Sequence, residues 1–101
     1  MQYNLVSINS STDLDNNGYE YYQYFLADAN GGSFNFVLPT NVWDGLSYII
    51  NRTDSNVLTS ITLSAHTGTV NGGASVTIAG KTYVDLIYFN GDWKVSRVSY
   101  L

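Results

Sequence analysis

Short runs of alternating apolar and polar residues recur along the whole chain, and this period of two is typical of half-buried β-strands. Gly, Asn, Asp and Ser residues, which favour turns, separate the runs. No run keeps the 3.6-residue apolar period of an amphipathic helix over several turns. The pattern predicts strands at Tyr3–Ile8, Tyr19–Ala27, Ser33–Leu38, Leu46–Arg52, Val57–Ser64, Thr69–Val70, Ala74–Ala79 and in both halves of Lys81–Tyr100.

The segment Lys81–Tyr100 contains the strongest turn signal, because Asn90-Gly91 lies between two apolar-rich runs. Both residues tolerate the positive φ that a two-residue type I′ turn requires. We therefore predict a β-hairpin in which Tyr88 pairs with Trp93. Alternation of side chains then places one set of residues on the core face, namely Leu86, Tyr88, Trp93 and Val95.

The second face of this hairpin is also apolar. It carries Tyr83, Ile87, Phe89 and Val98 beside a few polar residues, and such a face is too hydrophobic to remain in open water. We expect it to pack against another sheet or another chain. These four residues are the predicted oligomer interface.

Regularly spaced short strands joined by Gly, Asn and Asp turns predict an all-β fold. We expect a small antiparallel β-sandwich or barrel-like jelly roll of about eight or nine short strands. In that arrangement the strand Ser33–Leu38 pairs with the preceding strand across the turn Asp28–Gly32. The length of 101 residues suits a single β domain that covers residues 1–101.

Charge and cysteine content exclude several function classes. The net charge is −4, so no positive field attracts phosphates and we expect no nucleic acid partner. The chain has no cysteine, which excludes disulfides and thiol chemistry. Residues 1–8 contain no basic residue and no long apolar run, so they match neither a signal peptide nor a membrane span. We expect no membrane insertion; the chain either uses no secretion signal or is part of a longer protein.

The segment Asp13–Gly18 matches the first half of a calcium-binding loop. Its Asp-x-Asp-x-Asn-Gly spacing provides alternating oxygen ligands at Asp13, Asp15 and Asn17. The match ends there, because Tyr24 occupies the position of the bidentate glutamate. We therefore expect no cofactor and an Asx-rich turn without metal, and calcium bound at these three residues is the alternative.

Aromatic residues make up 15% of the chain, a density that suits sheet packing, interfaces or sugar-stacking surfaces. Rings at suitable spacing could stack on the apolar face of a sugar while nearby amides and carboxylates bind its hydroxyls. Ordinary packing in the sheets is the alternative for the same rings. The candidate ligand-binding residues are Tyr19, Tyr21, Tyr22, Tyr24 and Trp43.

No catalytic motif accompanies the polar residues. His66 is the single histidine, and a Ser-His-Asp triad could be drawn with Asp85 or Asp92, but no nucleophile elbow is present. We therefore expect no catalytic residues and no enzymatic activity.

A series of short motifs in the last two-thirds of the chain forms an ordered pattern. The motifs are Phe36-Val37-Leu38-Pro39, Gly45, Tyr48-Ile49-Ile50-Asn51-Arg52, Thr62-Leu63, Val70-Asn71-Gly72, Ser75-Val76-Thr77-Ile78, Leu86-Ile87-Tyr88 and Asn90-Gly91-Asp92-Trp93-Lys94-Val95. In this order they resemble a short β domain found in bacteriophage tail-fibre and other virion-surface appendage proteins. The aromatic first third of the chain departs from that pattern.

The resemblance implies a viral structural domain at the virion surface, hence extracellular, that serves host attachment or assembly without catalysis. It also implies a homo-oligomer, with a homotrimer favoured and a cell-surface receptor or glycan as partner. The two-faced apolar strands agree with an oligomer. The alternative function is a lectin-like carbohydrate-binding module that uses the aromatic residues as its platform.

Overall fold

The computed structural model describes residues 4–16, 19 and 22–100, and it shows an all-β protein built as a mixed, partly parallel β-solenoid of about three turns. No helix in these residues has the length and hydropathy needed to cross a membrane. The strands are β1 (Leu5–Ile8), β2 (Thr12–Asp13), β3 (Tyr24–Ala27), β4 (Phe34–Leu38), β5 (Ser47–Arg52), β6 (Ile61–Ala65), β7 (Thr69–Val70), β8 (Ser75–Ile78), β9 (Thr82–Phe89) and β10 (Asp92–Ser99).

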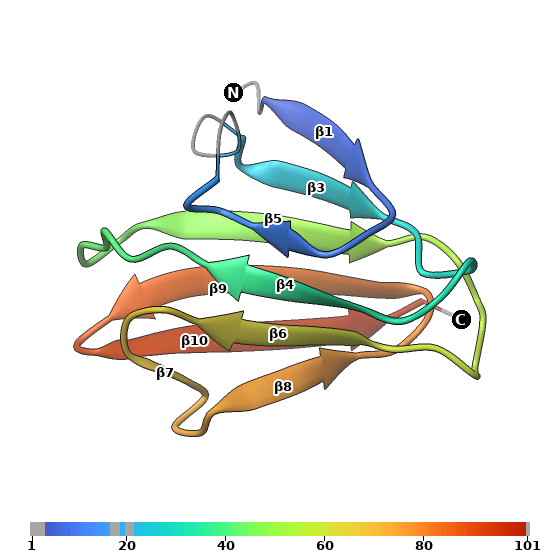
Figure 1. Ribbon diagram of the computed structural model, residues 1–101. Helices are drawn as coiled ribbons and strands as arrows, with labels where there is room; N and C mark the ends of the chain where they lie inside the picture. The colour runs from blue at the N-terminus through green and yellow to red at the C-terminus, as the bar shows by residue number, and fades with distance from the viewer. Residues whose placement is uncertain (1–3, 17–18, 20–21, 101) are drawn as a thin grey trace.

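The chain winds by alternating between two sheets. Sheet A has the strand order β1-β3-β5-β9-β10-β7, and sheet B has the order β2-β4-β6-β8. Strands β1, β3 and β5 run parallel to one another, as do β2, β4 and β6. One strand of each sheet makes up a coil: β1 with β2 is the first coil, β3 with β4 the second and β5 with β6 the third. The coils stack on one another (Figure 1).

This arrangement shows that the predicted antiparallel sandwich or jelly roll is wrong. Strand β4 was expected to pair with β3, but β3 pairs with β1 and β5 while β4 pairs with β2 and β6. The segment between them crosses from one sheet to the other, and its Ala29 is fully buried. Strands of a hairpin sandwich and strands of a solenoid both bury every second residue, so the alternation fits either fold.

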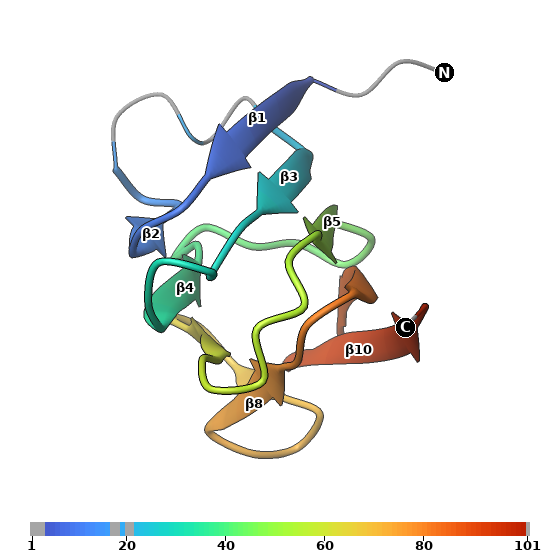
Figure 2. The same cartoon turned by 90° about the vertical axis from the view of Figure 1, so that its right-hand side faces the viewer.

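The core lies between the two sheets, which form separate walls when viewed from the side (Figure 2). Phe25 of sheet A and Phe36 of sheet B meet edge to face across it, with ring centroids 4.9 Å apart. Within each sheet, residues at the same position of successive coils stack on one another. Phe25 is level with Ile50, which is level with Val84 on β9.

The β9–β10 hairpin is confirmed, and it ends the parallel stack. Asn90 and Gly91 both have positive φ, at 51° and 79°. Tyr88 pairs with Trp93 as predicted, and Trp93 is fully buried against the rings of Tyr48 and Tyr88. Because β9 runs antiparallel to β5, and β8 antiparallel to β6, the last strands close the coil sequence instead of continuing it.

Two predicted strands are shorter than expected. The strand predicted at Val57–Ser64 begins only at Ile61, and the side chains of Val57 and Leu58 are 86% and 89% exposed. The strand predicted at Tyr19–Ala27 begins at Tyr24. In the first case the cause is visible, since the residues before Ile61 wrap around a buried side chain, that of Arg52.

Arg52 is fully buried at the end of β5, and all three nitrogens of its guanidinium donate hydrogen bonds. Nε and Nη2 donate to the two carboxylate oxygens of Asp54, at 3.0 and 2.9 Å. Nη1 donates to the carbonyl of Ile78 at 2.6 Å and to that of Thr59 at 3.2 Å. Nη2 also donates to the carbonyl of Asn56 and the hydroxyl of Thr59. One side chain thus fixes the connection from β5 to β6 and the end of β8.

Asp54 extends this network to two further turns. Its carboxylate accepts the amide of Ala29, in the connection from β3 to β4, at 2.8 Å, and its carbonyl accepts the amide of Lys81, in the turn before β9, at 2.8 Å. Gly80 lies so close that a Cβ there would be 2.8 Å from the same carbonyl. Three connections on one side of the solenoid, β3 to β4, β5 to β6 and β8 to β9, therefore converge on the Arg52–Asp54 pair.

The substitution Asp54→Asn is expected to lower the free energy of unfolding by about 3–5 kcal/mol, because it leaves the buried Arg52 charge without its counter-ion. Urea unfolding followed by tryptophan fluorescence measures the change. The matched control is Asp85→Asn on the exposed face of β9, which should change stability by less than about 0.5 kcal/mol. Equal effects of the two variants would contradict the role of the pair.

Stability should also depend on pH through this carboxyl group. The hydrogen bonds from Arg52 hold the pKa of Asp54 well below its usual range, with further lowering from the amides of Ala29 and Asn56. A depressed pKa in the folded state stabilises the fold above the unfolded pKa of about 4, and this contribution is lost as the pH falls below it. Asp54→Asn should therefore flatten the loss of stability between about pH 4 and pH 2.

Candidate functional site

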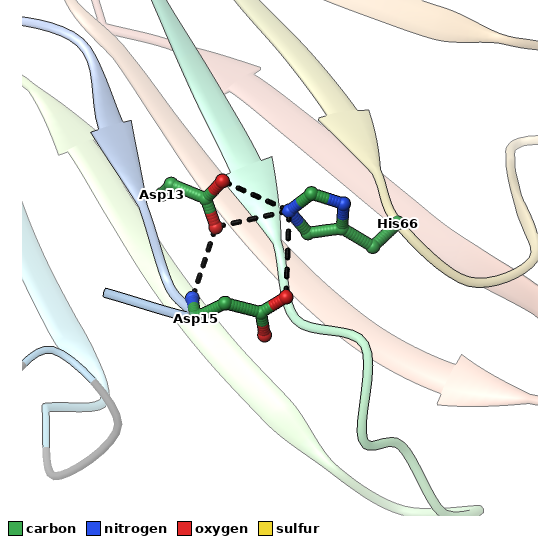
Figure 3. Close-up of side chains that lie close together, drawn as sticks. All are labelled: Asp13, Asp15 and His66. Atoms are coloured by element: carbon green, nitrogen blue, oxygen red, sulfur yellow. Dashed lines mark hydrogen bonds and ion pairs between the residues drawn. The ribbon is translucent and has the colours of Figure 1, made fainter. Parts of the chain in front are cut away.

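Asp13, Asp15 and His66 form a cluster of potential ligand side chains (Figure 3). Asp13 ends β2 and Asp15 follows it, while His66 comes directly after β6. Both strands run parallel in sheet B, with β4 between them. Because β2 of the first coil and β6 of the third coil run parallel, their carboxyl ends lie at the same edge of sheet B.

The imidazole of His66 faces both carboxylates. Its Nε2 lies 3.0 Å and 2.9 Å from the two oxygens of Asp13 and 3.4 Å from Oδ2 of Asp15. One potential ligand atom from each of the three residues lies within 4.8 Å of the others. About a third of each side chain is exposed, at 31% for Asp13, 36% for Asp15 and 38% for His66. The cluster is therefore accessible to small solutes.

The end of β4 holds both ligand-bearing segments in place. The amide of Leu14 donates to the carbonyl of Val37, and the amide of His66 donates to the carbonyl of Leu38. Thr40, just beyond β4, donates its amide and its hydroxyl to the two oxygens of Asp15, at 2.9 and 2.6 Å. The segment that carries Asp13 and Asp15 and the segment that carries His66 are therefore both hydrogen-bonded to the end of β4 and the residues that follow it.

Charge and hydrogen bonding shift the pKa values of the cluster. The hydrogen bond that His66 donates to the Asp13 carboxylate raises the pKa of His66, and the negative charges of Asp13 and Asp15 add to the rise. The hydrogen bonds from Thr40 lower the pKa of Asp15. Burial raises the pKa of the nearby Tyr48 hydroxyl, with a further contribution from the Asp15 charge. An ionised carboxylate and a protonated imidazole are thus both favoured here.

The arrangement suits ion pairing or metal binding better than nucleophilic catalysis. His66 pairs with Asp13 and Asp15, not with Asp85 or Asp92, which sequence reasoning had offered as triad partners. Among the described residues, no serine hydroxyl is hydrogen-bonded to His66. A general base without a positioned nucleophile does not make a triad.

The predicted calcium residues are only partly placed. Asp13 and Asp15 come together, and Asn17 lies outside the described residues. His66 is the member that sequence reasoning missed, since it was considered separately from Asp13. No local sequence signal joins them: Thr12 is level with Phe36, which is level with Leu63, and these unequal spacings form no visible repeat.

The predicted aromatic platform is distributed over several parts of the fold. Tyr19 packs on Phe25 and Tyr22 at the core, with ring centroids 6.4 and 6.5 Å apart. Tyr24 lies on the outer face of sheet A, because the adjacent Phe25 points inward. Trp43 is 61% exposed in the connection from β4 to β5. Tyr21, the remaining platform residue, lies outside the described residues.

The predicted interface residues form an exposed patch on β9 and β10. Ile87 is 46%, Phe89 56% and Val98 62% exposed, and Tyr83 is half-buried. All four point away from the core, since they alternate with buried residues or pair across the hairpin with residues that do. We refer to Tyr83, Ile87, Phe89 and Val98 as the outer patch.

A shallow depression of about 370 Å³ lies where the parallel strands of sheet A end. Its lining combines apolar side chains with hydroxyl, amide and carboxylate groups. These groups belong to the ends of β1 and β3 and to the residue after β5. The lining residues are Ser7, Ile8, Asn9, Leu26, Asp28 and Thr53.

Comparisons with protein-family models, with curated proteins and with solved structures found no match. The resemblance to appendage domains therefore stays a prediction.

The pKa of His66 should exceed its ordinary value of 6.5 in metal-free protein. His66 is the only histidine, so its ring signals in NMR titrations are unambiguous. Asp13→Asn should return the pKa toward 6.5, and the control Asp85→Asn should leave it unchanged. Because the folded pKa is raised, the ion pair stabilises the fold fully below the unfolded pKa, and this contribution is lost as the pH rises through the folded pKa. A pKa at or below 6.5 would contradict the geometry.

Proposed function

We propose that this chain is a non-catalytic structural domain of a virion surface or viral appendage, and that it self-associates to serve host attachment or assembly. A homotrimer is the favoured form. The location is extracellular. The ordered motifs described above support the viral assignment, and the outer patch supports the self-association.

The observation that carries this proposal is the exposure of the outer patch. Ile87, Phe89 and Val98 are large apolar side chains on a regular sheet, and between 46% and 62% of each is exposed in the single chain. Fully burying one such side chain is worth about 1.5–3 kcal/mol. Ile87 and Phe89 follow each other on this face of β9, and Val98 pairs with Tyr83 beyond the Asp85–Ser96 pair. We take these exposed apolar side chains as the contact surface for a second copy of the chain.

The outer patch is confined to the β9–β10 hairpin. On β5, Ile87 is level with Ser47 and Tyr83 is level with Asn51, so polar residues border the patch on that side. A second copy of the chain would therefore contact mainly β9 and β10.

Ile87→Asp should dissociate the oligomer. Burying an unpaired carboxylate costs several kcal/mol, so the dissociation constant should rise by roughly a hundredfold or more. Sedimentation velocity at micromolar concentration measures the change. Ile87 is exposed in the single chain, so the monomer should remain folded by circular dichroism.

The matched control is Leu58→Asp, which introduces the same charge at a side chain that is 89% exposed outside the sheets. This variant should keep the oligomer. A wild-type chain that sediments as a monomer at micromolar concentration would contradict the self-association. So would an oligomer that survives Ile87→Asp.

Carbohydrate binding is the second candidate function, and the depression in sheet A is the observation that favours it. Asn9, Asp28 and Thr53 offer polar groups for hydroxyls, while Ile8 and Leu26 offer apolar contact. Tyr24 lies two residues from Leu26 on the same face of β3. A glycan array tests this function, and a signal lost in Asp28→Ala but kept in Leu58→Asp would favour it over a purely structural role.

A further inference from the structure

We propose that Asp13, Asp15 and His66 bind a divalent transition metal ion of the zinc class. The site would take two carboxylate oxygens from the first coil and the Nε2 atom of His66 from the third coil. These atoms converge from opposite sides of β4, at an edge of sheet B that solvent can reach. The proposal is independent of the self-association described above.

The spacing of the ligand atoms suits one small cation. Zinc bonds to imidazole nitrogen and carboxylate oxygen are about 2.0–2.2 Å, so ligand atoms in a tetrahedral site lie about 3.3–3.6 Å apart. Nε2 of His66 is 3.4 Å from Asp15 Oδ2 and 2.9 Å from Asp13 Oδ2. The ligand atoms of the two carboxylates lie within 4.8 Å of each other, so these exposed side chains can reach the tetrahedral spacing by moving at most about 1.5 Å.

The imidazole decides the class of metal. Calcium takes six to eight oxygen ligands, and magnesium keeps a shell of oxygens and water. An imidazole with carboxylates suits zinc and its neighbours in the first transition series. A site with His66 at its centre is therefore expected to prefer zinc to calcium, although the Asp13-x-Asp15 spacing resembles a calcium loop.

The charge balance also favours a divalent ion. Two carboxylates face one imidazole, so even a protonated His66 leaves one negative charge uncompensated. A divalent ion bound to neutral His66 compensates both carboxylates. Thr40 already orients the Asp15 carboxylate through two hydrogen bonds, which is the supporting role that outer residues play in metal sites.

The bound ion would join coils that are distant in sequence. Asp13 and His66 are 53 positions apart, and only β4 separates their strands in sheet B. A metal bond between them would clip the first coil to the third. Zinc should therefore raise the melting temperature, by roughly 10 °C at a free concentration of a hundred times the dissociation constant.

The first experiment uses the chelator-treated 101-residue chain and zinc chloride. NMR detection of the imidazole nitrogens is selective, since His66 is the only histidine. Zinc at stoichiometric amounts should shift the Nε2 resonance and leave the proton on Nδ1. An unchanged Nε2 resonance at millimolar zinc would overturn the proposal. Calcium binding measured by calorimetry without an imidazole shift would also overturn it, in favour of an oxygen-only site.

The second experiment compares variants by calorimetry. His66→Gln and Asp15→Asn should each weaken zinc binding by roughly tenfold or more, and Asp85→Asn should not. All three positions are solvent-exposed, so folding should be retained and is checked by circular dichroism. Zinc affinity that is equal in His66→Gln and in the wild type would overturn the assignment, whatever the oligomeric state proves to be.

Discussion

The buried pair of Arg52 and Asp54 is the interaction on which the rest of this fold depends. A guanidinium with no solvent contact must find partners for its donors, and Arg52 finds them in Asp54, Asn56, Thr59 and Ile78. The chain after β5 therefore wraps around the Arg52 side chain, and β6 begins only at Ile61. The connections before β4 and before β9 bind to the same aspartate. The Arg52–Asp54 pair thus fixes three connections between strands, namely β3 to β4, β5 to β6 and β8 to β9.

Parallel stacking has a direct consequence for chemistry. In each sheet, strands from successive coils end at the same edge, so polar residues that follow them gather there. At the edge of sheet B this brings Asp13, Asp15, Thr40 and His66 together, and at the edge of sheet A it brings Asn9, Asp28 and Thr53 together. An antiparallel hairpin sandwich would have sent these residues to different ends. The candidate sites are therefore products of the coil geometry.

The parts of the fold set by neighbouring residues were predictable from the sequence, and the parts set by distant contacts were not. Asn90-Gly91 specifies a two-residue turn by itself, so the register of β9 with β10 and the buried position of Trp93 were predicted correctly. The Asp28–Gly32 turn resembles a hairpin turn, but its role depends on Asp54, 25 positions beyond Ala29. The alternation within β3 and β4 is the same in either fold. The pairing of His66 with Asp13 required the coil spacing, which differs from coil to coil and leaves no obvious repeat.

The outer patch lies on sheet A and the cluster of Asp13, Asp15 and His66 lies on sheet B, so the proposed assembly and the proposed metal binding can be tested separately. The cluster depends on the parallel stacking of the coils, and backbone NMR contacts test this stacking most directly. The coiled arrangement predicts contacts of Phe36 with Leu63 and of Phe25 with Ile50, in parallel register. Close Hα–Hα contacts between residues 24–27 and residues 34–38, as in an antiparallel hairpin, would contradict it.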